Sequence, residues 1–243
     1  MRRPLLPARP ARALLAAALV APVLLAGCTR SGGTATPTGS ASPDAAATLA
    51  TAEKVLNATP SLHFTITTPS TPGAAAVLAG ATGDVVRPDK FSGTLDVAIG
   101  GQRLNVKVVS VSGTVWAQVF GSWSTVDPAK FGVHDPGTLL APQGGLADLL
   151  GAATDATFAG EKRRGSEVLR LVDAQIPGAA VAKVLTTTDP SKTVPAVFAI
   201  EEATGQLREA TLTGPFFSKE QQSTYTVVLE KYGEQVDIRA PAG

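Results

Sequence analysis

Hydrophobic and polar residues alternate with a period of two over several stretches of the chain. The first stretch places Leu62, Phe64 and Ile66 on one side and polar residues on the other. This pattern predicts a strand with one dry face. His63 falls on the wet face, where we interpret it as a solvated side chain and not as a ligand.

The most regular alternation lies between residues 91 and 126. One predicted strand carries its apolar residues on a single face: Phe91, Leu95, Val97 and Ile99. Gly100-Gly101 then supplies the positive φ angles of a tight hairpin turn. The returning strand continues the apolar face with Leu104, Val106 and Val108. After a second turn at Ser112-Gly113 a strand follows to residue 120, which predicts an antiparallel meander whose apolar face needs a cover.

Helical spacing predicts the elements of that cover. A helix is expected from Asp44 to about residue 57, and a shorter one begins at Asp135-Pro136, an N-cap followed by proline at the first helical position. Gly144-Gly145 precedes a second short, leucine-rich turn, and a further helix is predicted over residues 177–187. The residues of these later helices that should face inward are Leu139, Leu140, Leu146, Leu149, Leu150, Val181, Val184 and Leu185.

Further strands are predicted over residues 157–159, 168–172, 196–202, 207–213, 223–231 and 236–239. The fold class is therefore α+β, an antiparallel sheet with one continuous apolar face and short helices covering it. Such a sheet either packs solid against its cover or leaves a gap. The pattern leaves both alternatives open.

A secretory signal is predicted over residues 1–27. Four arginines precede an apolar run from Ala13 to Ala26, which has the length and flanks of a signal peptide and is short for a membrane span. The segment ending in Gly27 and Cys28 is similar to a bacterial lipobox, in which Cys28 is diacylglycerylated and becomes the first residue of the mature protein. The alternative is an ordinary signal followed by a stray cysteine, which an exported protein disfavours.

The residues after the lipobox divide into a tether and a domain. Residues 29–43 contain no large apolar side chain and consist mainly of Ser, Thr, Gly, Ala and Pro. They cannot bury enough surface to fold, so residues 28–43 are predicted to be a flexible tether. Residues 44–243 are predicted to form a single domain.

The charge and cysteine content of the chain argue against several classes of function. Without the four arginines of residues 1–27, 17 basic and 20 acidic residues remain, a net charge of −3. That balance argues against a nucleic-acid partner and against a polybasic membrane patch. Because Cys28 is the only cysteine, no disulfide can form, and the 44% apolar content has to supply the core.

Catalytic motifs are absent from the sequence. It lacks the G-x-S-x-G elbow, the P-loop, the H-E-x-x-H motif and the Cys-His spacing of metal sites. His63 and His134 are the only histidines, and neither has a paired acid at helical spacing. The charge runs Glu161–Arg164 and Glu201-Glu202 are interpreted as solvated loops. We therefore predict a protein that is not an enzyme and that uses no metal and no cofactor.

Several segments in a fixed order resemble a known family. They are SLHFTI, GTLDVAIGG, TVWAQV, SWSTVDPAKFGVHDPGTLLAPQGGLADLLG, VPAVFAIEEATGQLREATL and VLEKYGEQVDI. Behind a lipobox and a Ser/Thr/Pro tether, they are similar to the actinobacterial cell-envelope lipoproteins LppX, LprA, LprF and LprG, with LprG most alike. The similarity extends from about Asp44 to Pro241.

The resemblance implies a strongly curved antiparallel sheet, a half-barrel like that of the LolA and LolB carriers, with helices on its concave face around an apolar cavity. It also implies a carrier of acylated glycolipid or triacylglyceride with a major-facilitator lipid exporter as a partner. The family's cavity-facing strand position falls on Leu95. The chain departs from the family at Phe120-Gly121-Ser122, which is shorter, and at Glu161–Arg164, which is more charged. Both departures are expected near the mouth of the cavity.

Two functions follow as alternatives. The first is a monomeric lipid carrier, anchored by lipid on the extracytoplasmic (periplasmic) side of the cell membrane, whose ligand contacts apolar residues of sheet and cover. The second is a structural or interaction lipoprotein with a solid core, which binds a transporter or a wall component with its surface. The candidate ligand-binding residues are Phe64, Ile66, Leu95, Val97, Ile99, Leu104, Val106, Val108, Leu139, Leu140, Leu146, Leu149, Leu150, Val181 and Val184.

Overall fold

A computed structural model describes residues 44–69, 76–131, 133–218 and 220–242. The predicted signal over residues 1–27, the lipobox with Gly27 and Cys28, and the predicted tether over residues 28–43 lie outside the described residues. Those predictions therefore stay predictions.

The first described element is the predicted helix, α1 (Ala45–Ala58). The side chain of Asp44 caps it by accepting a hydrogen bond from the Ala46 amide at 3.1 Å. Pro60 follows the C-cap and cannot continue the helix. The residues buried on one face are Ala45, Leu49, Ala52 and Leu56. Both predicted ends of this helix are confirmed.

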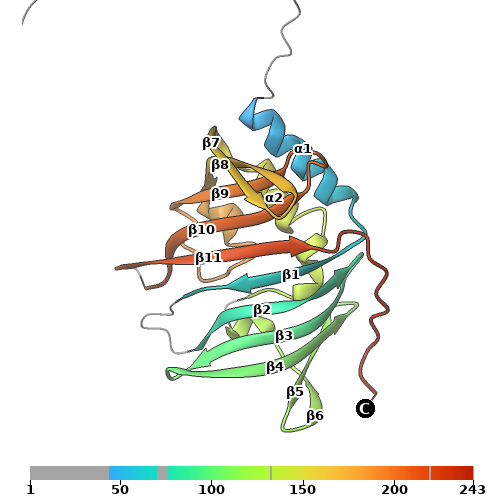
Figure 1. The fold of residues 1–243 in the computed structure, drawn as a ribbon. Helices are drawn as coiled ribbons and strands as arrows, with labels where there is room; N and C mark the ends of the chain where they lie inside the picture. Colours follow the sequence, from blue (N-terminus) through green and yellow to red (C-terminus); the bar gives the residue numbers. More distant parts are fainter. Residues whose placement is uncertain (1–43, 70–75, 132, 219, 243) are drawn as a thin grey trace, which may run out of the picture. The chain divides into compact units, whose positions relative to one another are not determined.

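Eleven antiparallel strands form one sheet within the described residues (Figure 1). In spatial order they are β6 (Ser122–Thr125), β5 (Thr114–Val119), β4 (Gln102–Val111), β3 (Lys90–Ile99), β2 (Ala76–Val86), β1 (Ser61–Thr67), β11 (Gln221–Glu230), β10 (Leu207–Ser218), β9 (Thr193–Glu201), β8 (Glu167–Pro177) and β7 (Thr154–Arg164). Only β1 and β11 are neighbours without being consecutive, so two meanders meet at that pair. The sheet is open, with edges at β6 and β7, and it curves as a half-barrel, which confirms the predicted fold class.

A pair of facing glycines lies between β2 and β3. Gly83 and Gly93 are opposite each other in register, and the ring of Phe91 lies over both. A Cβ atom would come within 2.6 Å of that ring at Gly83 and within 2.7 Å at Gly93. Only glycine fits at either position, so the two backbones and the aromatic ring that covers them can approach closely.

Two-residue turns with a left-handed backbone connect the strands from β3 to β6. Gly100-Gly101, at φ 58° and 81°, confirms the predicted β3–β4 turn. Ser112-Gly113 has φ 52° and 76°, and Phe120-Gly121 has φ 50° and 86°. Positive φ at both positions matches the hairpin turn whose twist fits that of the paired strands.

Strand β2 is missing from the sequence prediction because both of its faces are apolar. Leu78 and Ala81 belong to the main core, whereas Val77 and Ala79 form a small cluster with Ala98. Phe217 of β10 packs against this second cluster. A strand that is buried on both faces loses the alternation by which strands are recognised.

Two predicted elements near the C-terminal half are wrong. The helix predicted over residues 177–187 is only the single turn α3 (Gly178–Val181), and the chain after it makes turns and a β-bridge at Leu185. The strand predicted over residues 236–239 is not formed. The preceding strand, β11, already has β1 and β10 as neighbours, so no free sheet edge lies beside it.

The charge runs are parts of strands and turns in which most charges are paired, contrary to the solvated loops that the sequence predicts. Glu161–Arg164 lies in β7, where Lys162 Nζ is 2.7 Å from Glu209 Oε2. Glu201 is 2.7 Å from Arg208. Because β7 and β6 are opposite edges of the sheet, Glu161–Arg164 and Phe120-Gly121-Ser122 do not share one mouth.

Short helical elements cover the concave side of the sheet. They are η1 (Pro128–Phe131), η2 (Pro136–Leu140), α2 (Leu146–Gly151) and α3, together with the longer α1. α1 packs against α2 and β7, whereas η2 packs against β2, β3 and β4. The apolar core lies between sheet and helices, with Phe64, Phe91, Phe198 and Leu229 at most 1% exposed.

Candidate functional site

An apolar hollow, here called the outer hollow, lies along β3, β4 and β5 near the β6 edge. Its volume is about 210 Å³. Its lining residues are all apolar: Leu95, Val97, Ile99, Leu104, Val106, Val108, Val115, Ala117, Val119, Val126, Pro128, Val133 and Pro136. Such a lining contacts hydrocarbon well and offers no side-chain partner to a polar group.

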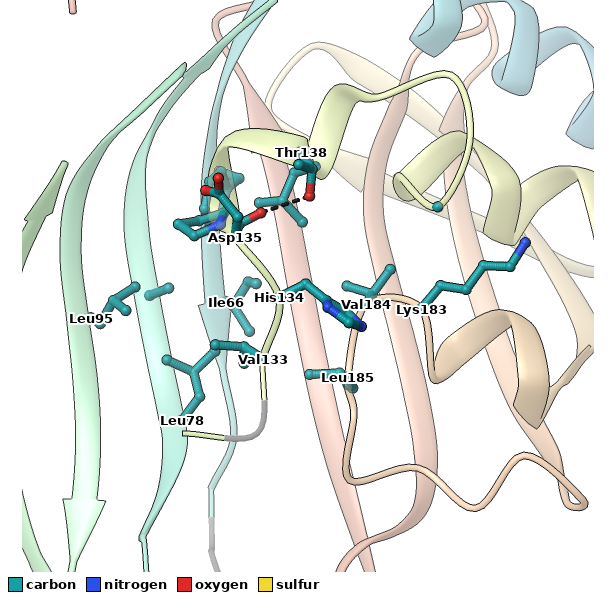
Figure 2. Close-up of a pocket in the computed structure, with 15 residues that line it drawn as sticks. Ile66, Leu78, Leu95, Val133, His134, Asp135, Thr138, Lys183, Val184 and Leu185 are labelled. Atoms are coloured by element: carbon teal, nitrogen blue, oxygen red, sulfur yellow. Dashed lines mark hydrogen bonds between the residues drawn. The ribbon is translucent and has the colours of Figure 1, made fainter. Parts of the chain in front are cut away.

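A second hollow, here called the inner hollow, lies between β1–β3 and the segment that covers them. It measures about 50 Å³. Its lining is Phe64, Ile66, Leu78, Ala81, Leu95, Val133, His134, Asp135, Pro136, Thr138, Leu139, Gly144, Lys183, Val184 and Leu185. Figure 2 shows Ile66, Leu78 and Leu95 on the sheet side of this space. Because Leu95, Val133 and Pro136 line both hollows, the two are adjacent.

Residues 133–139, here called the cover segment, lie over both hollows. Asp135 Oδ1 accepts a hydrogen bond from the Gly137 amide at 2.8 Å, and Thr138 Oγ1 donates to the Asp135 carbonyl at 2.7 Å. This cap confirms the predicted start at Asp135-Pro136, although the element is a 3₁₀ turn. A Cβ on Gly137 would lie 2.7 Å from the Asp89 carbonyl oxygen, so the backbones approach closely there.

One β-bridge joins the cover segment to the chain after α3. It pairs Val133 with Leu185 in an antiparallel sense. The bridge brings Val184 and Lys183 to the inner hollow, although they are some fifty positions away in sequence. The cap orders the cover segment internally, whereas the close approach at Gly137 and the bridge between Val133 and Leu185 connect it to other described parts of the chain.

A polar rim lies at the mouth of the inner hollow and comprises His134, Asp135, Thr138, Gly144 and Lys183 (Figure 2). Lys183 Nζ lies 3.5 Å from Asp148 Oδ2, and the same oxygen accepts from the Gly144 amide at 2.6 Å. The Oδ2 atom of Asp135 is buried without a hydrogen-bond partner. A carboxylate oxygen of this kind can accept a hydrogen bond from a hydroxyl group. The rim therefore carries a cation paired with Asp148, and a buried acceptor without a partner lies beside it.

Among the described residues, no three His, Cys, Asp or Glu side chains group together as they would to hold a metal ion. His63 is not simply solvated, contrary to its prediction, because its ring lies 2.7 Å from Asp84 Oδ1 and 3.2 Å from Thr82 Oγ1. It alternates with Phe64, which enters the core, so His63 and His134 of the rim do not share a site. In the described part of the chain, no helix is long and apolar enough to cross a membrane.

The sequence of this domain matches a known protein family. The model of the LppX_LprAFG lipoprotein family matches residues 44–238. The chain belongs to this family. The resemblance noted in the sequence is confirmed.

Relatives of this LppX_LprAFG chain include carriers. The lipoarabinomannan carrier protein LprG of Mycobacterium tuberculosis is 28% identical over 234 residues, which cover 94% of each protein. The protein of the same name from Mycolicibacterium smegmatis is 27% identical over 240 residues, 95% of this chain and 96% of that protein.

Solved structures of other LppX_LprAFG members share the fold. LprF from Mycobacterium bovis has a TM-score of 0.71 at 19% identity, over 83% of this chain and 99% of that one. LppX from Mycobacterium tuberculosis has a TM-score of 0.60 at 16% identity, over 80% and 98%. At these identities the likeness establishes the fold alone.

Ten of the fifteen predicted ligand-binding residues of this LppX_LprAFG domain line one of the two hollows. Those at the inner hollow are Phe64, Ile66, Leu95, Leu139 and Val184. Those at the outer hollow are Leu95, Val97, Ile99, Leu104, Val106 and Val108. The other five are buried in the core and line neither: Leu140, Leu146, Leu149, Leu150 and Val181. Ligand binding by any of them stays a prediction.

Several lining residues were not predicted from the sequence. On β5 they are Val115, Ala117 and Val119, which occupy every second position. This is the same alternation that identified the lining residues of β3 and β4. No sequence pattern indicated Lys183, because the residue is brought to the polar rim by the β-bridge between Val133 and Leu185, which are far apart in sequence. Periodicity finds residues on a strand, but not residues that a tertiary bridge brings to it.

Proposed function

We propose that this protein holds the acyl chains of a lipid between its sheet and the cover segment and carries that lipid through the cell envelope. The observation that carries the proposal is the outer hollow, whose lining is apolar throughout. Two of its residues, Ile99 and Leu104, are 43% and 51% exposed. Water-exposed apolar surface is unfavourable unless a ligand or partner covers it. Membership of a family that includes lipoarabinomannan carriers supports the same function.

The size of the hollows indicates how a lipid enters. They measure about 210 and 50 Å³, below the roughly 300 to 1,000 Å³ of pockets that enclose a drug-sized ligand. A lipid with two or more acyl chains therefore requires the cover segment to move away from the sheet. η1 and η2 have four and five residues, and 3₁₀ turns of this length are weakly hydrogen-bonded.

The polar rim favours a head group that donates hydrogen bonds. When the cover segment moves away and uncovers Asp135 Oδ2, a hydroxyl group would satisfy this oxygen, and Lys183 would bind a sugar oxygen or a phosphate. An acylated glycolipid uses both the hollows and the rim, whereas a triacylglyceride uses the hollows. As the family resemblance implies, a major-facilitator exporter would receive the lipid from the carrier.

Cys28 is the proposed site of membrane attachment on the extracytoplasmic side. A diacylglyceryl group supplies two chains, and two are what stable attachment requires. Cys28→Ala should release soluble protein or leave uncleaved precursor, as fractionation and N-terminal mass analysis would show. A wild-type mature N-terminus at any residue other than 28, without acylation, contradicts this part of the proposal.

Native mass spectrometry tests the carrier function. Residues 28–243 with Cys28→Ala, purified from an actinobacterial host, should weigh more than the polypeptide by one lipid with two or three acyl chains. Organic extraction should remove the extra mass. A mass that extraction leaves unchanged would favour the alternative, an interaction lipoprotein that binds a transporter or wall component with its surface.

A further inference from the structure

Phe120 is the most exposed large apolar side chain among the described residues, at 104%. It stands in the β5–β6 turn directly after Val119, which is itself 45% exposed. An aromatic ring in this position contacts water on both faces. Its hydration is unfavourable unless something covers it.

The turn at the other end of β5 shows that the backbone does not require an aromatic residue. Ser112-Gly113 has φ 52° and 76°, and Phe120-Gly121 has φ 50° and 86°. In such turns small polar residues suit the left-handed first position, and a bulky side chain there is unusual. At Phe120 both the left-handed backbone and the water-exposed ring are therefore unfavourable. At Ser112 the backbone is the same, but the polar side chain is not unfavourable in water.

Phe120 adjoins the outer hollow through its neighbour in sequence, Val119, and does not itself line the hollow. Ile99, Leu104 and Val119 line that hollow and are 43%, 51% and 45% exposed. We call Ile99, Leu104, Val119 and Phe120 the tip patch. Because the hollow is lined by apolar residues alone, an acyl chain that reaches the tip patch can enter without passing a polar side chain.

The exposed charges near the tip patch are mainly basic. Lys107 is opposite Gln118 in the β4–β5 register, two positions before Phe120. Arg103 is paired with Asp96 at 2.7 Å, which leaves the exposed Lys107 and Lys130 against the single acid Asp127 between residues 100 and 131. Basic side chains beside an apolar tip complement an anionic surface.

We propose that the tip patch inserts into the head-group region of an anionic lipid bilayer, so that lipid passes between bilayer and outer hollow without crossing water. One ring on a narrow turn offers little area for a rigid protein interface, which typically buries about 800 Å² on each side. One ring is enough to insert into the fluid head-group region of a bilayer beside other apolar residues. The purpose of this docking rests on the proposed carrier function, but the surface can be tested by itself.

The length of the predicted tether is compatible with docking to the membrane that holds the anchor. α1, which follows the tether, packs against β7, and β7 and β6 are opposite edges of the eleven-stranded sheet. At roughly 4.8 Å per strand spacing, these edges are about 48 Å apart along the sheet. Residues 28–43 can extend to about 55 Å.

The single cysteine of the chain allows a direct test. In residues 28–243 with Cys28→Ser, which retain every described residue, Phe120→Cys provides one position for an environment-sensitive fluorophore. With vesicles of equal phosphatidylglycerol and phosphatidylcholine, its emission should shift to the blue and spin-labelled lipid should quench it. The matched control is Ser112→Cys, whose label sits in the same kind of turn at the other end of β5 and should remain in water. Equal responses from both labels, or none from position 120, would overturn the proposal.

A second variant measures the binding itself. Phe120→Ser copies the residue that the β4–β5 turn uses, so the melting temperature should not fall, while vesicle partitioning should drop about tenfold, as expected for withdrawing one aromatic side chain from the interface. The double variant Phe120→Ser/Ser112→Phe keeps the composition and should not restore binding. Unchanged partitioning of Phe120→Ser contradicts the proposal. A wild-type dimer that dissociates in Phe120→Ser would assign the tip patch to a second copy and also overturn it.

The two proposals fail separately. Protein that carries no lipid in native mass spectrometry, but whose label at position 120 enters vesicles, contradicts the carrier function and leaves the docking surface intact. Protein that carries lipid but whose label stays in water contradicts only the docking surface.

Discussion

The two meanders of the sheet present similar apolar faces but bury them differently. In β7–β11, the solid meander, Phe198 and Leu212 are 1% and 3% exposed. The hollow of about 330 Å³ between α1 and β8–β9 differs from the outer hollow because charged side chains, Arg170, Glu201 and Glu202, are part of its lining. In β1–β6, the hollow meander, Ile99 and Leu104 are 43% and 51% exposed, although they belong to the same kind of alternating strand. The difference lies in what covers each face. Near the solid meander lie α1, with fourteen residues, and α2, whereas η2 with five residues packs on β2, β3 and β4.

Alternation therefore specifies which face of a strand avoids water, and the covering helices decide whether that face is filled. A long helix brings an apolar residue every third or fourth position and can fill the space between strands. A 3₁₀ turn of five residues cannot, so hollows remain beneath it. The contrast between the two meanders is thus a difference in cover, and it can be tested by mutation.

The largest expected effect comes from a matched pair of leucines. Leu229→Ala removes a side chain with 0% exposure in β11 and should cost about 2 to 5 kcal/mol, which lowers the melting temperature by roughly 5 to 15 °C. Leu104→Ala, at 51% exposure in β4, should cost less than about 1 kcal/mol. Urea denaturation of both proteins measures the difference. Equal costs would contradict the distinction between solid and hollow meanders.

An intermediate effect is expected at the cover segment. Gly137→Ala introduces a Cβ 2.7 Å from the Asp89 carbonyl oxygen, which should displace the segment and cost about 1 to 3 kcal/mol. Hydrogen exchange should become faster at the Thr138 and Ala141 amides, whose bonds close this turn. Asp135→Asn is the control, because asparagine caps as well as aspartate. Unchanged exchange in Gly137→Ala would show that the close approach does not hold the cover segment.

The smallest effect on stability is expected for a substitution at Leu95, which lines both hollows. The same substitution should have the largest effect on bound lipid. In Leu95→Trp the larger side chain should occupy the hollow, abolish lipid loading and leave the melting temperature near that of the wild type. Leu212→Trp in the solid meander, where the side chain is 3% exposed, should instead overpack and cost about 1 to 3 kcal/mol or more.

Two outcomes at Leu95 would change the interpretation. A folded Leu95→Trp protein that still takes up lipid normally would show that Leu95 does not line the binding site. A strongly destabilised one would show that the space around Leu95 is as tightly packed as the solid meander. Native mass spectrometry and thermal denaturation of the same sample separate these cases.

Sequence alone predicts the parts of this fold whose signals are local. The β3–β4 hairpin is readable because Gly100-Gly101 fixes the turn and strict alternation fixes the register. Strand β2 is not readable, since Phe217 from a distant strand packs against the cluster on its second face. The leucines of α2 were assigned correctly to the interior, but nothing in their spacing separates a filled core from the wall of a hollow.

The exposed tip patch was also beyond a sequence prediction. Its residues are ordinary strand and turn positions, and only the tertiary arrangement leaves them without a cover. Lys183 is a similar case, because a helix prediction over residues 177–187 gives no indication that the residue joins a polar rim. Sites formed by segments distant in sequence require the fold before they can be recognised.

The facing glycines Gly83 and Gly93 have a consequence for how such a protein accommodates ligands of different sizes. They are paired in the β2–β3 register and the ring of Phe91 lies over both, so this part of the sheet is closely packed and we expect it to move little. The cover segment, by contrast, is connected to other described parts by the bridge between Val133 and Leu185 and by the close approach of Gly137 to Asp89. We therefore expect longer or additional acyl chains to be admitted by the distance to which the cover segment lifts, and not by widening of the sheet. Ligands of different lengths would then share one fixed wall, and relatives with other lipid preferences would differ mainly in their covers.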